Sequence, residues 1–290
     1  MYNNLKDKLF SLFIFFFSIT QLNFAQVEKV VDGFQFTEGP VWKDGALLFS
    51  DIPANKIYRW NVKDGLSVFL EPSGNSNGLA LDKEGNLLLA QHGNRRLAKL
   101  FSDGKEISLA SEYFGSKLNS PNDIAVKSDG SIFFTDPPYG IKPEQEELGY
   151  YGIYRLSKNG KLRLLDNSLR RPNGIAFSPD EKLLYVTNSE TKDIYVWEVA
   201  DSIITDRRLF ASMEPNGAGD GLKINSEGRL FVAGSVGIWI FEKDGTFIES
   251  IEIPGQTTNC AWGDEDRKTL YITSGDALYK YRSNLTTYDK

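Results

Sequence analysis

Six short segments of the chain resemble one another, and each begins with a side chain that carries an oxygen. We call these first residues the anchor residues: Glu38, Asn77, Asn122, Asn173, Asp220 and Asn259. Successive anchors lie 39 to 51 residues apart, and a repeat of this period with strand-like content is typical of propeller blades. A purely structural repeat does not need a polar residue at its first position every time. The series therefore predicts a ring of blades whose anchors meet at one central point.

The residues that follow each anchor support this architecture. A short apolar run leads to a turn such as 43–45 or 128–130 and then to a more hydrophobic run. Asp-Gly between apolar runs is a strong hairpin signal, and alternating aromatic and β-branched residues suit covered strands. We predict an all-β fold, a six-bladed β-propeller with four strands per blade and a central metal site. A β-sandwich or an open stack is less compatible with near-equal repeats that lack a capping repeat.

The two ends of the chain carry further expectations. The segment 28–36 precedes the first anchor, and we expect it to add the missing strand to the last blade and close the ring. Before it, Lys6 and Lys8 precede an apolar run at 9–19, and a polar stretch ends at Ala25. This order is typical of a secretory signal peptide, and the run is shorter than the about 20 residues that span a bilayer. We expect residues 1–25 to be a cleaved signal peptide and residues 26–290 a single propeller domain.

Composition limits the compartment and the partners. The signal peptide predicts an exported protein, periplasmic or secreted, with no membrane span after cleavage. The formal net charge is −6, which argues against nucleic acid as a partner. Cys260 is the only cysteine, so the core and the closed ring must stabilise the fold without disulfides. We expect Cys260 to be a small buried residue, because no local motif supports a nucleophile.

The anchor set predicts a metal site. The innermost strand of each blade lines the channel of a propeller, so its first residue sits at the channel mouth. Two carboxylates and four amides would converge there, and each buried polar group without a partner costs about 1–3 kcal/mol. A divalent cation removes that cost. Ligands that are all hard oxygens favour calcium or magnesium, and calcium tolerates irregular geometry best. Manganese or zinc could occupy the site in vitro. In the alternative interpretation, each Asn-Gly or Asp-Gly is a turn that begins a strand.

Several longer motifs carry a resemblance to a known family. They occupy residues 37–42, 91–96, 119–123, 134–140, 171–178 and 219–221. Together they resemble the senescence-marker/gluconolactonase/luciferin-regenerating-enzyme family of six-bladed propellers, over essentially the whole chain after residue 25. Gln-His-Gly at 91–93 and Asp-Pro-Pro-Tyr-Gly at 136–140 resemble its bacterial gluconolactonase-like branch.

This resemblance implies roles for particular residues. The metal ligands of the family fall on four anchors: Glu38, Asn122, Asn173 and Asp220. The resemblance also implies that Asp220 is the proton acceptor, and it leaves Asn77 and Asn259 to line the pocket. Animal members that hydrolyse sugar lactones have a substrate-contacting Arg where this chain has Ser120. The expected substrate-binding residues are Asn77, His92, Ser120, Asp136, Tyr139 and Asn259.

The function implied is metal-dependent hydrolysis of a small-molecule lactone, such as the sugar lactone gluconolactone, to its hydroxy acid. A cation would polarise the carbonyl group, and Asp220, or alternatively Asp136, would take the proton of the attacking water. Two other functions remain open. One is hydrolysis of phosphotriesters or fluorophosphates at the same kind of calcium site, and the other is a non-catalytic ligand-binding propeller.

Three further features have both a functional and a structural interpretation. His92 is the only histidine, and it either contacts substrate or holds a neighbouring loop. The longest interval between anchors contains an inserted segment, 137–151, which we expect to cover the channel mouth with Tyr139 as a wall. Arg170 and Arg171 are expected to pack or to form ion pairs.

Overall fold

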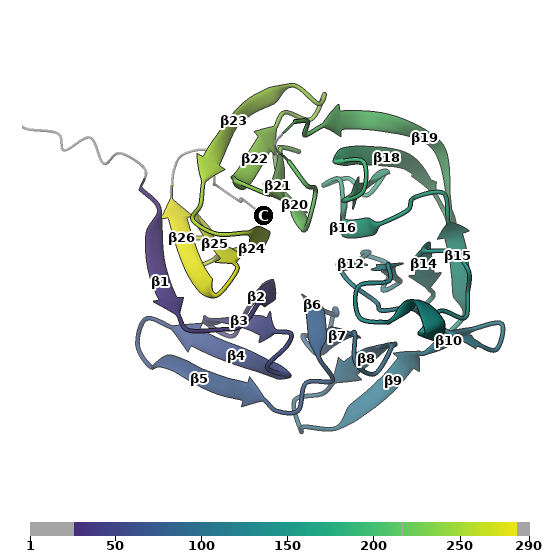
Figure 1. Ribbon diagram of the computed structural model, residues 1–290, viewed down its shortest axis with the longest axis horizontal. Coiled ribbons are helices and arrows are strands. Elements are labelled where there is room, and N and C mark those ends of the chain that lie inside the picture. The colour runs from purple at the N-terminus through teal and green to yellow at the C-terminus, as the bar shows by residue number, and fades with distance from the viewer. Residues whose placement is uncertain (1–25, 216, 283–290) are drawn as a thin grey trace, which may run out of the picture.

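The computed structural model describes residues 26–215 and 217–282, which form six four-stranded antiparallel sheets around a central axis (Figure 1). The predicted all-β, six-bladed β-propeller is confirmed. Blades 1 to 3, each written from the innermost strand outward, are β2 (Thr37–Lys43), β3 (Ala46–Asp51), β4 (Lys56–Asn61) and β5 (Gly65–Leu70); β6 (Ser76–Leu81), β7 (Leu87–Gln91), β8 (Arg96–Leu100) and β9 (Glu106–Ala110); β12 (Ile124–Val126), β13 (Ile132–Asp136), β14 (Gly152–Leu156) and β15 (Leu162–Asp166).

The remaining blades follow the same order, and the last one takes its outermost strand from the start of the described chain. Blades 4 to 6 are β16 (Pro172–Phe177), β17 (Leu183–Asn188), β18 (Asp193–Ala200) and β19 (Ile203–Ser212); β20 (Leu222–Ile224), β21 (Leu230–Gly234), β22 (Gly237–Phe241) and β23 (Phe247–Glu252); β24 (Thr257–Gly263), β25 (Thr269–Ser274), β26 (Ala277–Arg282) and β1 (Glu28–Asp32). The pairing of β1 with β26 confirms the predicted closure, and it covers an edge that would otherwise be open to aggregation.

The core lies between neighbouring blades, where the faces of successive sheets pack on each other. Its largest fully buried side chains are aromatic and include Trp197, Tyr154 and Tyr271. Contacts such as the stacked rings of Trp42 in blade 1 and Tyr271 in blade 6, with centroids 5.5 Å apart, join the two ends of the chain. The ring is thus held by apolar burial and by closure, as the absence of disulfides requires.

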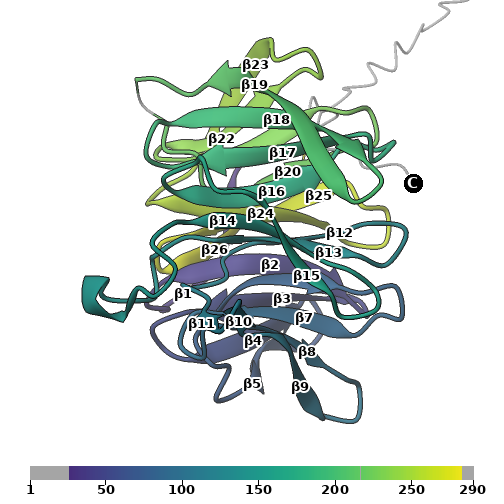
Figure 2. The same cartoon turned by 90° about the vertical axis from the view of Figure 1, so that its right-hand side faces the viewer.

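The inserted segment departs from the blade pattern. Two short strands, β10 (Glu112–Tyr113) and β11 (Ser116–Lys117), form an additional hairpin before blade 3, and the 3-10 helix η1 (Pro143–Gln145) lies in the segment after β13. Figure 2 shows this helix standing out from one face of the ring. Part of its acidic stretch is paired, because Glu147 accepts from the backbone N–H of Lys117 and lies 3.3 Å from the Arg95 guanidinium.

The predicted signal peptide, residues 1–25, lies outside the described residues, so export stays a prediction. Within the described ranges, none of the helices has the length and apolar character needed to cross a membrane.

Candidate functional site

The six anchors lie at the same end of the six innermost strands, where local backbone irregularities redirect them. The pairing of β2 with β3 shifts register between Glu38 and Val41, and equivalent shifts occur at the start of β6, β16 and β24. In blades 3 and 5 the anchors Asn122 and Asp220 stand just before the strand. A register shift with an extra residue in one strand bends that strand and redirects its side chains. The result is a cluster of polar side chains at one mouth of the channel.

Close contact between blades explains the glycines that follow several anchors. The N–H of Gly78 donates to the carbonyl of Asn122 in the next blade at 2.8 Å, and that of Gly174 donates to the carbonyl of Asp220 at 3.2 Å. A Cβ at either glycine would overlap those carbonyl oxygens. The Asn-Gly pattern is therefore not a simple turn signal. At these two glycines it marks the point where the backbone beside one anchor is bonded to the next anchor.

Hydroxyl groups from the second strands complete this belt. Ser50, Thr135 and Thr187 donate to the anchor carbonyls of the following blades, at 2.8, 2.6 and 2.7 Å. The acceptors are the carbonyl oxygens of Asn77, Asn173 and Asp220. Side-chain to backbone bonds of this kind, buried or partly buried, fix these three anchors relative to the neighbouring blades. The anchors therefore sit on a rigid frame rather than on free loops.

A cavity of about 740 Å³ opens at this mouth. Its wall includes the four anchors that the resemblance assigns to a metal, and also Asn77, His92 and Tyr139. Seven of the ten predicted site residues thus line one cavity, which they share with Arg171 and Ser189. Ser120, Asp136 and Asn259 do not line it; they are buried behind the wall.

The oxygens that face this cavity fit a hard cation. Asn173 donates through its Nδ2 to Ser189 Oγ at 3.1 Å, which leaves its buried Oδ1 without a partner. Glu38 Oε2 accepts from the N–H of Gly39 and from Asn259 Nδ2, and the Glu38 carboxyl group also interacts with that of Asp220. Unpaired buried acceptors are rare and call for an explanation. Carboxylate and amide oxygens are what calcium and magnesium bind, so the donor set is compatible with such an ion.

The carboxylates of the site repel each other in a buried setting. Burial raises the pKa of Glu38 to about 7, and the charge of Asp123 adds to the rise while the N–H of Gly39 opposes it. Burial also raises the pKa of Asp220 well above its usual range, with the charges of Glu38 and Asp123 acting in the same direction. A bound divalent cation would reverse this balance by stabilising the charged forms.

Comparisons with known proteins assign the chain to a family. Residues 36–276 match the family model described as SMP-30/Gluconolactonase/LRE-like region. The chain belongs to this family. The gluconolactonase of Zymomonas mobilis is 35% identical, over 89% of this chain and 81% of the relative. The pentonolactonase of Haloferax volcanii is 25% identical, over 86% of this chain and 84% of the relative.

The fold of this family member also matches a solved relative. The structure of a gluconolactonase from Xanthomonas campestris superposes with a TM-score of 0.84 at 35% identity, and the match covers 89% of each chain. The resemblance inferred from the motifs is thereby confirmed for the family.

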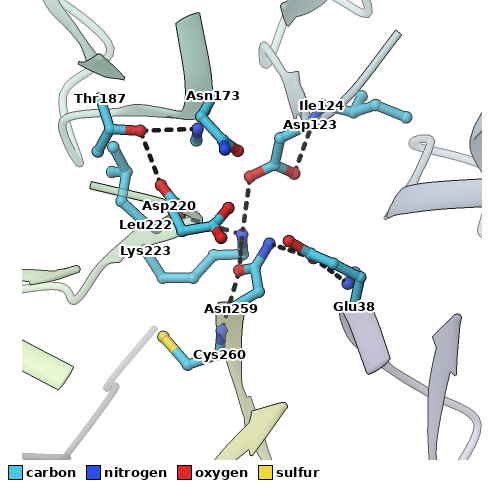
Figure 3. A network of polar contacts seen from close by, with 12 residues as sticks. Glu38, Asp123, Ile124, Asn173, Thr187, Asp220, Leu222, Lys223, Asn259 and Cys260 are labelled. Carbon is cyan, nitrogen blue, oxygen red and sulfur yellow. Dashed lines mark hydrogen bonds and ion pairs between the residues drawn. The ribbon is translucent and has the colours of Figure 1, made fainter. Parts of the chain in front are cut away.

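Two charged residues of the site were not found from the sequence. Asp123 and Lys223 lie directly behind Glu38 and Asp220, with the Lys223 ammonium 3.5 Å from Asp123 Oδ2 (Figure 3). A signal for both was present in the repeat. Asp123 stands where four other repeats have glycine, and Lys223 stands where four others have Val or Ala. A charged residue at a position that is otherwise small or apolar indicates a special site.

Two of the three predicted residues behind the wall bond to neighbouring backbone. Ser120 Oγ donates to the carbonyl of Pro137 at 2.6 Å and accepts from the N–H of Gly140 at 2.8 Å. Asp136 accepts from the N–H of Asn119 at 2.8 Å, and burial raises the pKa of this carboxyl to about 7. These contacts hold the segment that carries Tyr139. In this family member, Ser120 therefore faces the loop and not the cavity.

His92 and Tyr139 form part of the cavity wall. Asn77 Nδ2 lies 3.2 Å from His92 Nε2, and burial lowers the pKa of this imidazole to about 4. A neutral ring accepts at Nε2 from the amide, which turns Asn77 Oδ1 away from the histidine, where it has no partner. Tyr139 reaches the wall from the inserted segment, as expected, and the Arg171 guanidinium lies 5.8 Å from its ring centroid.

Cys260 has the structural character expected of it. The side chain is fully buried, and burial raises the pKa of its thiol to about 12. A thiol with so high a pKa does not form the thiolate that a nucleophile requires.

Proposed function

We propose that this protein is a metal-dependent lactonase that opens a lactone, such as a sugar lactone of the gluconolactone type, to its hydroxy acid. The relatives named gluconolactonase and pentonolactonase support lactone hydrolysis. The observation that carries the proposal is the convergence of Glu38, Asn122, Asn173 and Asp220 in one cavity, with a buried amide oxygen of Asn173 left unpaired.

Glu38, Asn122, Asn173 and Asp220 would hold the cation, and calcium suits their oxygens best, with magnesium, manganese or zinc as substitutes. The chemistry that such an ion supplies is Lewis-acid polarisation of the lactone carbonyl. Asp220 would take a proton from the attacking water and return it to the ring oxygen as the C–O bond breaks. The use of one carboxyl group both to accept and to donate the proton is consistent with the buried position of Asp220 among other carboxylates.

The other residues of the wall would place the substrate. Asn77 is oriented by the neutral His92, and Tyr139 closes one side of the cavity with Arg171 across its ring face. Groups held in one geometry lower the entropy cost of the reaction. Asn259 would act from behind the wall, because its Nδ2 donates to Glu38 Oε2 at 3.1 Å.

The test is a pH-stat titration of the purified protein with sugar lactones, aliphatic lactones and a fluorophosphate, with and without EDTA. We expect acid release from a lactone above its spontaneous rate, lost with EDTA and restored by calcium. Asp220→Asn should lower kcat about 100- to 10,000-fold in the folded protein. Asp244→Asn, a change in a surface turn, is the matched control and should leave kcat unchanged.

The other outcomes would identify the alternatives. Acid release from the fluorophosphate alone would indicate phosphotriester chemistry. If no substrate gives acid although the protein binds a divalent cation, the propeller is a binding module. An active Asp220→Asn enzyme would refute the role of this residue in proton transfer.

A further inference from the structure

We propose that Lys223 is a counter-cation of the site. Its positive charge partly compensates the carboxylates when no metal is bound, and the same charge lowers the affinity of the site for a divalent cation. The inference rests on the proposed metal dependence and concerns a residue to which the family resemblance gives no role.

The position of Lys223 is unusual for a lysine. It lies on the innermost strand β20. Its side chain lines a second cavity of about 600 Å³, which opens at the end of the channel opposite the cavity with the anchors. Only a quarter of the side chain is exposed. The ammonium group is 3.1 Å from Asn259 Oδ1 and 3.1 Å from the carbonyl of Leu222. The charge is thus placed in the layer that separates the two cavities.

The charges of this layer nearly balance a divalent ion. Three carboxyl groups, those of Glu38, Asp123 and Asp220, act on one another, and Asp123 Oδ2 forms an ion pair with the Lys223 ammonium at 3.5 Å. When all three carboxyls are deprotonated, the state that a bound cation would favour, three negative charges and one positive charge leave a net charge of −2, which matches one divalent cation. Arg171 cannot fill this role equally well, because its guanidinium is half exposed and pairs with Glu190 at 3.3 Å.

A chain of hydrogen bonds connects Lys223 to a predicted metal ligand (Figure 3). Asn259 Oδ1 accepts from Lys223 Nζ and from the N–H of Cys260, at 3.1 and 2.9 Å. These two donors fix the amide so that Nδ2 points to Glu38 Oε2 at 3.1 Å. The N–H of Cys260 remains when the ammonium is removed, so we expect the Asn259 amide to keep its orientation. The effect of the Lys223 charge can therefore be measured separately from the effect of this hydrogen-bond chain.

The experiment measures divalent-cation binding by titration calorimetry, with calcium as the probe, and thermal unfolding in EDTA and in saturating calcium. Lys223→Met removes the charge and keeps the apolar stem. We expect this variant to bind calcium at least about tenfold more tightly than the wild type does. Its Tm should fall further below that of the wild type in EDTA than in calcium. Lys223→Arg keeps the charge and should bind like the wild type.

A second variant guards against misfolding and tests the charge balance directly. Lys223→Met with Asp123→Asn removes one positive and one negative charge, so the calcium affinity should return to the wild-type range. Lys99→Met is the matched control, because Lys99 is similarly buried and pairs at 2.6 Å with Asp82, which follows β6 at the end away from the anchor Asn77 and lines the opposite cavity. It should lower Tm equally in EDTA and in calcium.

The outcomes separate this inference from the proposed function. If the wild type binds calcium while Lys223→Met binds it no more tightly, or loses Tm equally in both conditions, Lys223 is only a structural residue. If the wild type binds no divalent cation, both the counter-cation role and the metal-dependent mechanism are refuted.

Discussion

The two ends of the innermost strands differ sharply, although the same six segments build both. At the active mouth, the strands begin with polar residues such as Glu38, Asn173 and Asp220, which line a cavity of about 740 Å³. Two or more residues further on, the same strands present apolar side chains such as Ile175 and Ala261 to the opposite cavity of about 600 Å³. Position along a strand, rather than the strand itself, therefore decides whether a residue serves chemistry or packing.

The difference extends to how polar groups are satisfied. Buried acceptors without a hydrogen bond, Oδ1 of Asn77 and Oδ1 of Asn173, lie at the active mouth, and each costs about 1–3 kcal/mol if it stays unpaired. The belt of backbone and hydroxyl bonds offsets this cost by fixing the anchors. Among the described residues that line the opposite cavity, none has an unpaired buried side-chain atom of this kind. The lining of the cavity with the anchors is therefore the less stable of the two, as is common where a site must meet a ligand.

The largest test of this contrast uses two positions on one strand. Asn173→Leu removes the unpaired amide oxygen and should lower activity about 10- to 100-fold. The free energy of unfolding should change little, because the substitution also removes a buried polar group that has no partner. Ile175→Ala, on the same strand β16, should lower that free energy by about 2–4 kcal/mol and leave kcat of the folded enzyme unchanged. Urea unfolding in EDTA and lactone kinetics check the pair.

Opposite results would break the contrast. If Asn173→Leu destabilises the protein as much as Ile175→Ala does, the anchor is a packing residue. If Ile175→Ala lowers kcat in the folded enzyme, the two ends of the strand are not independent.

The repeat made the fold predictable, whereas the details of the site depended on contacts between blades. Six anchors at a regular interval specified the ring, and the segment before Glu38 specified its closure. Ser120 was expected at the substrate because it occupies the position of a substrate-contacting Arg, and Asp136 because it was an alternative proton acceptor, but their bonds to neighbouring backbone hold them behind the wall. Lys223 was missed although four other repeats have Val or Ala at its position, because a charge there marks a special site without naming its partner, and that partner, Asp123, lies in another blade.

A pH effect provides the second test of the difference between the two ends. Behind the active mouth, burial raises the pKa of Asp136 to about 7, whereas at the opposite end Asp82 pairs with Lys99 at 2.6 Å, and this contact lowers its pKa in spite of burial. A raised native pKa means that the folded state binds more protons than the unfolded state. The contribution of Asp136 to stability is therefore complete below about pH 4 and is lost as the pH rises to about 7.

Asp136→Asn should remove this loss. Between pH 4 and pH 8 the wild type should lose as much as about 4 kcal/mol that the variant keeps, as measured by urea unfolding in EDTA at several pH values. Asp82→Asn is the control with the opposite sign. The lowered native pKa of Asp82 means that its carboxylate stabilises the folded state above about pH 4, and the variant lacks this stabilisation. If Asp136→Asn follows the wild-type pH profile, the folded protein does not hold this carboxyl neutral between about pH 4 and pH 7.

The smallest expected effect compares two serines, one at each end. Ser120 Oγ joins Pro137 and Gly140 and so holds the segment that carries Tyr139, while Ser178 Oγ at the opposite cavity bonds Asp180 and the N–H of Leu183, at 2.7 and 3.0 Å.

Each change to alanine should cost about 1 kcal/mol of stability through its lost bonds. Only Ser120→Ala should also raise KM a few-fold, with kcat nearly unchanged, because it loosens the wall without touching the reacting atoms. Steady-state kinetics on the lactone that the protein hydrolyses best distinguish the two variants. A fall in kcat comparable to that of Asp220→Asn would mean that the Ser120 hydroxyl itself reaches the substrate, and an equal rise in KM for Ser178→Ala would mean that both ends of the channel shape the cavity.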